Sequence, residues 1–329
     1  MWQQITSFSN LYLAYKKAKK GKASRPEVAE FSFDLERNLL VLSDELQKLR
    51  WWPGKYRHFT IYERKQRTIT AAPFRDRVVH HAIMNVVGSD ADSIFSSHCY
   101  ACRTCKGVHR AVDQYQQWAK HYKYVIKLDV KRYFPSIDHR VIKNQLKELV
   151  SDNRVFMLFD RIIDAYEDQS GKGMAIGNLT SQFFANLYLN EFDHWVNNDL
   201  GITAYLRYVD DFVLLANDKN ELWSAAERIA LKLNDVKLIL HPNKIQVRRT
   251  SEKVDMFGYQ VSPNKRWLRN DNGHRFRRRL NNMAVKFARN EMNFSDVTPC
   301  VNSWIGHAQH GETSGLREQI FKEVIFKRA

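Results

Sequence analysis

Two apolar runs near the middle of the chain, residues 205–208 and 212–216, flank a pair of adjacent acids. Both runs are rich in aromatic and branched aliphatic residues, which is typical of β-strands. The pattern predicts a hairpin with Asp210 and Asp211 where the chain turns. Aspartate is also an ordinary turn former, so the hairpin alone leaves the role of the two acids open.

A second apolar run, residues 125–128, leads directly into a third acid, Asp129. If these strands lie side by side in one sheet, Asp129 and Asp210 converge, and each charge opposes ionisation of the other unless a cation joins them. Clustered carboxylates are hard oxygen ligands that suit Mg²⁺. A pair of such ions can activate an attacking hydroxyl and stabilise a leaving pyrophosphate. The pattern therefore predicts a nucleotidyl transferase in which Asp129, Asp210 and Asp211 hold two Mg²⁺ ions, for which Mn²⁺ can substitute.

Helical periodicity dominates both ends of the chain. Apolar residues recur at helical spacing in 11–20 and 33–46, which predicts a helical segment over residues 1–54. From residue 263 the sequence becomes basic and then reads as helical up to residue 329.

Shorter patterns predict the elements between these ends. Residues 56–62 and 67–70 alternate like the two strands of a hairpin, with the turn at 63–66. Residues 221–233 form an amphipathic helix by spacing, and the apolar run 236–240 after it reads as a further strand.

Charge and composition favour a soluble protein with a polyanionic partner. The net charge is +16, with 52 basic against 36 acidic residues, so nucleic acid is the first candidate partner, although a protein can also be basic without such a partner. No stretch approaches the ~20 apolar residues of a membrane span, and the N-terminus has no signal-peptide pattern. We therefore expect a cytoplasmic protein without membrane contact.

The cysteines allow one further kind of site. Cys99, Cys102 and Cys105 are spaced as in some metal sites. A closed zinc site needs four ligands, so Cys300 or a nearby histidine such as His98 or His109 would have to complete it. Reduced structural thiols are the alternative expected in the cytosol.

The motifs around the acids resemble those of one family. Tyr208-Val-Asp-Asp211 resembles the polymerase signature of reverse transcriptases, and Asp129 followed by Phe134 matches their first catalytic motif. The resemblance extends from about residue 55 to 262. It implies an α+β right-hand polymerase: a helical segment over 1–54, fingers and a ferredoxin-like palm sheet over 55–262, and a short helical thumb over 263–329. It also implies synthesis of cDNA from dNTPs on a template RNA, with the RNA/cDNA duplex as a further partner.

The resemblance assigns roles to further residues. Lys65 and Arg67 match the fingers cations that grip the triphosphate, and Arg suits phosphate through its planar fork of donors. The ring of Phe134 leaves no room for a ribose 2′-hydroxyl, and Lys244 matches a lysine proposed to protonate pyrophosphate. Each assignment has a structural alternative. The fingers cation Arg67 could be a surface residue of a strand, Phe134 could be an ordinary core residue, and Lys244 could be a lysine in a surface turn. The remaining assignments are a base-pair pocket that includes Ile176, Gly177 and Gln182, and a primer grip of Phe257, Gly258 and Tyr259.

One segment departs from the common family pattern. Residues 173–182 carry Ile176 where most reverse transcriptases have glutamine, and Ser181 is followed by Gln182 instead of proline. This resembles the diversity-generating retroelement branch, which implies misincorporation opposite template adenines, mutagenic retrohoming and a small basic accessory protein that forms a ring. Glutamine can hydrogen-bond near the sugar and template base, whereas isoleucine offers only shape, so discrimination between bases should weaken.

Two other interpretations remain open at this stage. The first is a defence-associated or retron-like bacterial reverse transcriptase. The second is a non-catalytic RNA-binding scaffold, against which the joint presence of Asp129, Asp210, Asp211 and Phe134 argues, since a scaffold needs none of them together.

Overall fold

A four-stranded antiparallel sheet forms the centre of the computed structural model, which describes residues 1–62, 66–166 and 171–328. The strand order is β4-β5-β3-β6. Helices α7 to α11 connect β3 to β4, and α12 connects β5 to β6, which gives the order of a split βαβ, or ferredoxin-like, sheet. The predicted α+β class and palm sheet are thus confirmed. The strands are β3 (Tyr124–Asp129), β4 (Tyr205–Tyr208), β5 (Asp211–Ala216) and β6 (Gln246–Arg249).

Alternation along these strands builds two hydrophobic cores, one on each face of the sheet. In β5, Phe212 and Leu214 enter one core, whereas Val213 and Leu215 enter the other. This is the period of two that a strand buried on both faces requires. The helices that cover the first core's face are α7 (Tyr133–Ser136), α8 (His139–Leu149), α9 (Asn153–Asp164), α10 (Leu179–Tyr188), α11 (Asn190–Asn198) and α12 (Lys219–Asp235).

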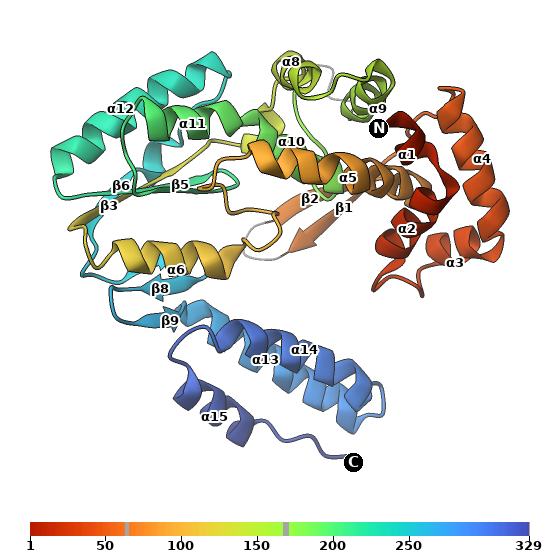
Figure 1. The fold of residues 1–329 in the computed structure, drawn as a ribbon. Helices are drawn as coiled ribbons and strands as arrows, with labels where there is room; N and C mark the ends of the chain where they lie inside the picture. The colour runs from red at the N-terminus through yellow and green to blue at the C-terminus, as the bar shows by residue number, and fades with distance from the viewer. Residues whose placement is uncertain (63–65, 167–170, 329) are drawn as a thin grey trace.

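The N-terminal helices pack into the first of these cores. Buried residues such as Ile5, Leu11 and Leu42 belong to the same cluster as Ile126 of the palm. Arg75 and Arg77 of α5 pair with Glu45 and Glu27 of the N-terminal helices. These helices lie to the right in Figure 1, around one end of the long helix α5. They are α1 (Trp2–Thr6), α2 (Phe8–Lys19), α3 (Pro26–Phe33) and α4 (Leu35–Gln47), and α5 spans Phe74–Ile94.

The fingers hairpin forms as the alternating pattern predicts. β1 (Arg57–Tyr62) pairs antiparallel with β2 (Gln66–Ala71), and Tyr62 lies opposite Gln66. The amide of Thr70 donates to the carbonyl of Ile176 at 2.9 Å, so the hairpin is fastened to the loop before α10. This contact brings two segments more than a hundred residues apart to one wall of the molecule.

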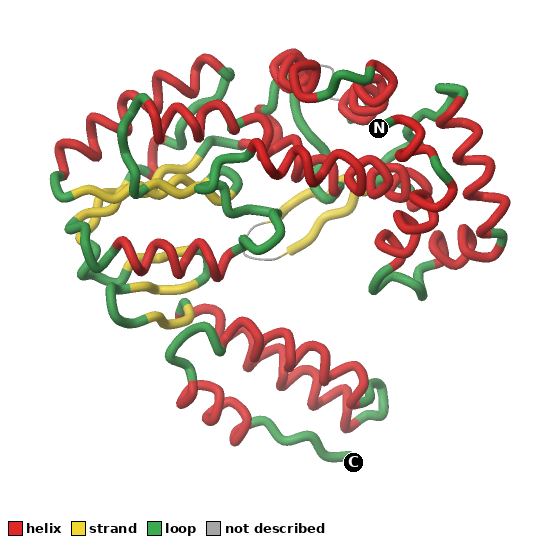
Figure 2. The backbone as a smooth tube through the Cα atoms, in the orientation of Figure 1, coloured by secondary structure: helices red, strands yellow, loops and turns green. Residues whose placement is uncertain are grey.

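A small third sheet links the palm to the C-terminal helices. Its order is β7-β8-β9, and it lies below the palm sheet in Figure 2. Residues of α6 (Val108–Trp118), the lower palm face and the C-terminal helices share the second core, for example Tyr115, Val213 and Phe276. The elements are β7 (Val254–Met256), β8 (Tyr259–Val261), β9 (Arg266–Leu268), α13 (Asn270–Ala288), α14 (Phe294–Ala308) and α15 (Ser314–Glu323). None of the helices in the described part of the chain has the length and apolar character to cross a membrane.

The strand predicted at residues 236–240 is wrong. Helix α12 runs to Asp235, the chain then turns with Lys237 in the left-handed region (φ 56°), and only Leu240 makes an isolated bridge, to Val130. The alternation that suggested a strand is real, because Leu238 and Leu240 are buried while Lys237 and Ile239 are exposed. The fourth palm strand is instead β6, whose residues are mostly polar.

Candidate active site

A two-residue turn between β4 and β5 carries the central acids. Tyr208 lies opposite Asp211 in the antiparallel register, which leaves Val209 and Asp210 as the loop. Val209 has φ 60°, a conformation that a β-branched residue adopts at a cost of about 1–3 kcal/mol. The carbonyl of Asp210 accepts the amide of Val130 at 3.1 Å, which fixes the turn against the end of β3.

The sheet register brings the third acid to the same place. Asp129, the last residue of β3, lies directly opposite Asp211. The Nζ atom of Lys244, from the short 3₁₀ helix Pro242–Lys244, lies 2.5 Å from Oδ2 of Asp129. The structure thus brings together Asp129, Asp210, Asp211 and Lys244, which the sequence predicts as one site.

The surroundings of Asp210 and Asp211 oppose the ionisation of both carboxyl groups. Burial and then the charge of Asp129 raise the pKa of Asp210. Burial and then the charge of Asp210 raise the pKa of Asp211 to about 7, although the Lys127 ammonium acts in the opposite direction. A divalent cation would offset both effects and return the carboxylates to their ionised form.

The donor set fits Mg²⁺ better than a metal that needs a closed set of protein ligands. Among residues 1–62, 66–166 and 171–328, no three His, Cys, Asp or Glu side chains converge as one preformed ligand set. Mg²⁺ is usually bound through one or two carboxylates, with waters and substrate phosphates as the other ligands. Asp129, Asp210 and Asp211 offer this kind of open carboxylate site.

A buried ion pair that the sequence analysis missed supports the turn that carries Val209 and Asp210. Arg207 and Asp193 are both fully buried, and Nη2 of Arg207 lies 2.6 Å from Oδ2 of Asp193. Nη1 of Arg207 donates to the carbonyl of Val209 at 3.0 Å. Burial alone would lower the pKa of Arg207, but the Asp193 carboxylate more than offsets this and the pKa lies above the usual arginine value. The signal in the sequence was an arginine inside an apolar strand, whose burial demands a partner.

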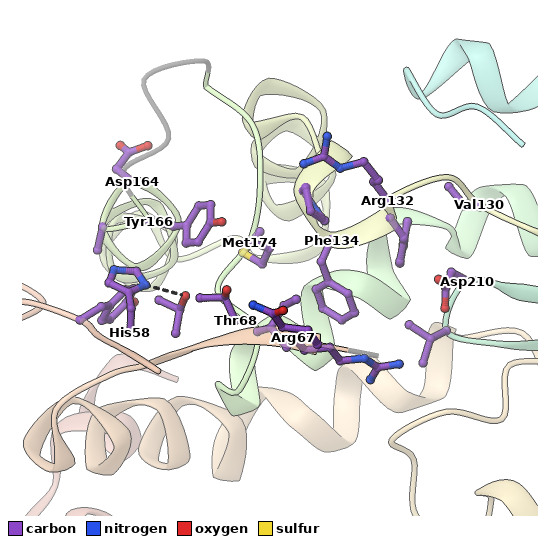
Figure 3. Close-up of a pocket in the computed structure, with 18 of the residues that line it drawn as sticks. His58, Arg67, Thr68, Val130, Arg132, Phe134, Asp164, Tyr166, Met174 and Asp210 are labelled. Carbon is purple, nitrogen blue, oxygen red and sulfur yellow. Dashed lines mark hydrogen bonds between the residues drawn. The ribbon is translucent and has the colours of Figure 1, made fainter. Parts of the chain in front are cut away.

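A cavity of about 1440 Å³ opens beside the acids. It is larger than the roughly 300–1,000 Å³ of ordinary small-ligand pockets. Figure 3 shows Asp210 at one end, His58 and Tyr166 at the other, and Phe134 and Arg67 between them. The lining residues include the predicted Asp129, Asp210, Asp211, Lys244, Arg67, Phe134 and Ile176.

The three other predicted nucleotide contacts are Lys65, Gly177 and Gln182. Lys65 lies outside the described residues. Gly177 has φ 124°, and a Cβ there would lie 3.0 Å from the Ile69 side chain, so glycine lets the loop approach β2. Gln182 is exposed on α10 and is not among the residues that line the cavity, so its nucleotide contact stays a prediction.

The predicted primer-grip residues form the turn between β7 and β8. Phe257 (φ 48°) and Gly258 (φ 102°) are its two loop residues, and both adopt the positive φ of a tight hairpin turn. The ring of Phe257 lies 5.0 Å from the ring of Tyr208, next to the catalytic turn, while Tyr259 is buried. The turn is therefore adjacent to the acids without lining the cavity.

The three closely spaced cysteines do not converge. Cys99 is buried, and its Sγ atom lies 3.4 Å from Asn186 Oδ1 and from Nη2 of Arg207, whereas Cys102 and Cys105 are exposed. Cys99 thus belongs to the surroundings of the buried ion pair.

Comparisons with known proteins give one family. Residues 57–261, more than half of the chain, match the family described as reverse transcriptase (RNA-dependent DNA polymerase). Protein YkfC of Escherichia coli is 24% identical over 269 residues, which cover 68% of this chain and 71% of that protein. The group II intron-encoded protein LtrA of Lactococcus lactis is 21% identical over 56% of this chain, but this covers only 33% of LtrA.

Solved structures support the same fold. Apo telomerase from Candida tropicalis, truncated from its C-terminal domain, superposes with a TM-score of 0.51 at 13% identity. The match covers 71% of this chain and 60% of the telomerase chain. At this identity the likeness concerns the fold alone, and it agrees with a right-hand polymerase.

Proposed function

The chain belongs to the reverse transcriptase (RNA-dependent DNA polymerase) family, and on this premise we propose that it copies an RNA template into cDNA by two-metal nucleotidyl transfer at Asp129, Asp210 and Asp211. The observation that carries the proposal is the register pairing of Asp129 with Asp211 beside the turn that holds Asp210, at one end of the cavity of about 1440 Å³. Divalent ions bound there would supply the electrostatic stabilisation of the attacking and leaving oxygens.

The other residues of the site take roles that their positions allow. Lys244, which pairs with Asp129, is proposed to donate a proton to pyrophosphate. The exposed Arg67 on β2 faces the same cavity, and its charge lowers the pKa of Asp210 as a secondary effect after burial and Asp129 raise it. A guanidinium so placed suits the triphosphate of a dNTP.

Phe134 is proposed to exclude ribonucleotides. Its ring lines the cavity and packs edge-on against Tyr133 at 5.7 Å, and Tyr133 is anchored by a hydrogen bond from its hydroxyl to the Ala185 carbonyl. The ring is therefore held by a buried neighbour instead of being free to move aside.

Replacing Phe134 with valine should raise ribonucleotide use relative to deoxynucleotide use by about tenfold or more, because the smaller side chain admits a 2′-hydroxyl. Single-nucleotide incorporation with dNTP and rNTP gives the two kcat/KM values. Their ratio corrects for any general loss of activity, since a folding defect lowers both. An unchanged ratio would contradict the steric role.

For the finer function we propose the diversity-generating subtype, in which synthesis is error-prone at template adenines. Ile176 supports this proposal because its side chain lines the cavity, while its carbonyl is occupied by the amide of Thr70. An aliphatic side chain there contributes shape but no hydrogen bond. Mutagenic retrohoming and a small basic ring-forming accessory protein belong to the same proposal.

The error spectrum of the cDNA tests the subtype. We expect wild-type errors to concentrate opposite template adenines, and the change Ile176→Gln to reduce them several-fold, because glutamine restores a hydrogen-bonding group. Sequencing of primer-extension products from both variants measures this. Accurate copying by the wild type would leave a reverse transcriptase and discard the subtype in favour of a defence or retron-like role.

A further inference from the structure

The cavity extends well beyond the catalytic acids to a second end that these roles do not use. Figure 3 shows His58 from the fingers hairpin and Tyr166 after α9 at the end away from Asp210. Arg161 lies in the last turn of α9, and its guanidinium carbon lies 4.4 Å from the ring centroid of Trp52. We call the part formed by Trp52, Lys55, His58 and Arg161 the distal end.

Trp52 is held in the cavity wall but remains open to solvent. Its neighbour Trp51 is fully buried, whereas Trp52 is 62% exposed. The following Pro53 restricts the backbone of Trp52 to an extended conformation. The amide of Gly54 donates to Oδ2 of Asp76 at 2.7 Å. The segment is thus fixed on both sides of an exposed indole.

Arg161 is fixed as firmly as the indole it covers. Its Nη1 donates to the carbonyls of Leu49 and Trp51, at 2.9 and 2.7 Å. One side of the indole therefore faces a guanidinium that is already held in place. Such a preorganised arrangement offers the remaining ring surface to a flat partner at little further conformational cost.

The charges around the indole favour an anionic, aromatic ligand. Lys55 and His58 line the same end. The acid there, Asp164, pairs with Lys143, whose Nζ lies 2.6 Å from Oδ1 of Asp164 and 2.7 Å from Oδ1 of Asp160, so this lysine is shared between two carboxylates. The cations at this end are Arg161, which lies over the Trp52 ring, and Lys55. Exposed aromatic rings next to basic side chains bind unpaired bases of single-stranded nucleic acid with little sequence preference.

From this geometry we propose that the distal end binds an unpaired base of the template RNA, ahead of the position being copied, by stacking on Trp52. The choice of template strand rests on the proposed function, because the distal end is continuous with the cavity at the acids. Trp52 lies before residue 57, where the match to the family begins, whereas His58 and Arg161 lie within it.

The test measures binding of the full chain to a primer–template duplex whose RNA overhang is eight adenosines long. Fluorescence anisotropy gives the Kd, with one abasic nucleotide placed at each overhang position in turn. For wild type we expect a single position, or two adjacent ones, at which the abasic site raises Kd. Trp52→Ala should raise Kd roughly 5- to 100-fold and abolish that sensitivity, whereas Trp52→Phe should retain it.

Trp223→Ala is the matched control, because Trp223 is an exposed tryptophan (44%) on α12 that does not line the cavity. Unchanged Kd in Trp52→Ala, or an equal loss on a duplex without an overhang, would overturn the inference. Extension by one nucleotide is measured in parallel. If an abasic site at one overhang position raises the Kd of the wild type but the protein never extends the primer, the proposed function is contradicted and the stacking inference stands. If the wild type extends the primer and Trp52→Ala has the wild-type Kd, the stacking inference is contradicted and the proposed function stands.

Discussion

The Asp210→Asn variant should lose cDNA synthesis by about 10³-fold or more while it keeps its affinity for RNA. Loss of a metal-ligating carboxylate removes several kcal/mol of transition-state stabilisation, and each 1.36 kcal/mol is about tenfold in rate. Asparagine has nearly the same shape, and burial and Asp129 already oppose ionisation of Asp210. We therefore expect the thermal stability of the variant to be equal to or above that of the wild type.

Single-turnover primer extension measures the rate, and anisotropy with labelled RNA measures the affinity. Asp235→Asn is the matched control, since it makes the same change at an exposed residue at the end of α12, where Lys232 is its partner. This control should behave as wild type. Asp210→Asn with synthesis intact would contradict the assignment of Asp210 as a metal ligand.

The largest stability effect should come from the buried pair. Asp193→Asn leaves the Arg207 guanidinium in the core without its counter-charge, and both side chains are fully buried. Removing one partner of such a pair lowers the free energy of unfolding by about 3–5 kcal/mol. The hydroxyl of Tyr205, which donates to Oδ1 of Asp193 at 2.6 Å, retains an acceptor in this variant. Urea denaturation at 25 °C measures the loss.

Two further variants separate charge from packing. The double change Asp193→Leu with Arg207→Met should recover much of the loss, because apolar replacement of a whole buried pair is often close to neutral. Asp235→Asn, which breaks an exposed pair, should change the free energy by less than about 1 kcal/mol. A loss of under 1 kcal/mol in Asp193→Asn would show that the pair is not needed to hold the fold.

The sequence was informative where chemistry and periodicity agreed. The sequence predicted that Asp129 and Asp210 converge, because each borders an apolar run and adjacent strands bring such borders together. In the structure the residue directly opposite Asp129 is Asp211, and Asp210 lies in the turn next to it. The fingers hairpin followed from the alternating runs 56–62 and 67–70, although Gln66, predicted in the turn, belongs to the second strand. The family and the fold could also be predicted, since Tyr208-Val-Asp-Asp211 and Phe134 occur in the expected order.

The features that could not be predicted from the sequence depend on contacts between residues that are distant along the chain. The run 236–240 alternates like a strand, but the left-handed Lys237 turns it away from the sheet while Leu238 and Leu240 still reach the core. The partner of Arg207 could not be read locally, because Asp193 comes from a helix fourteen residues earlier. Likewise, only the folded chain places α9 beside Trp52.

Primer extension by the wild-type protein on a defined RNA template, with Mg²⁺ and all four dNTPs, tests the central claim most directly. The account predicts cDNA complementary to the template, whose synthesis stops when EDTA removes the metal and requires the RNA strand. A wild-type protein that binds the primer–template duplex in the presence of Mg²⁺ but adds no nucleotide to the primer would contradict it.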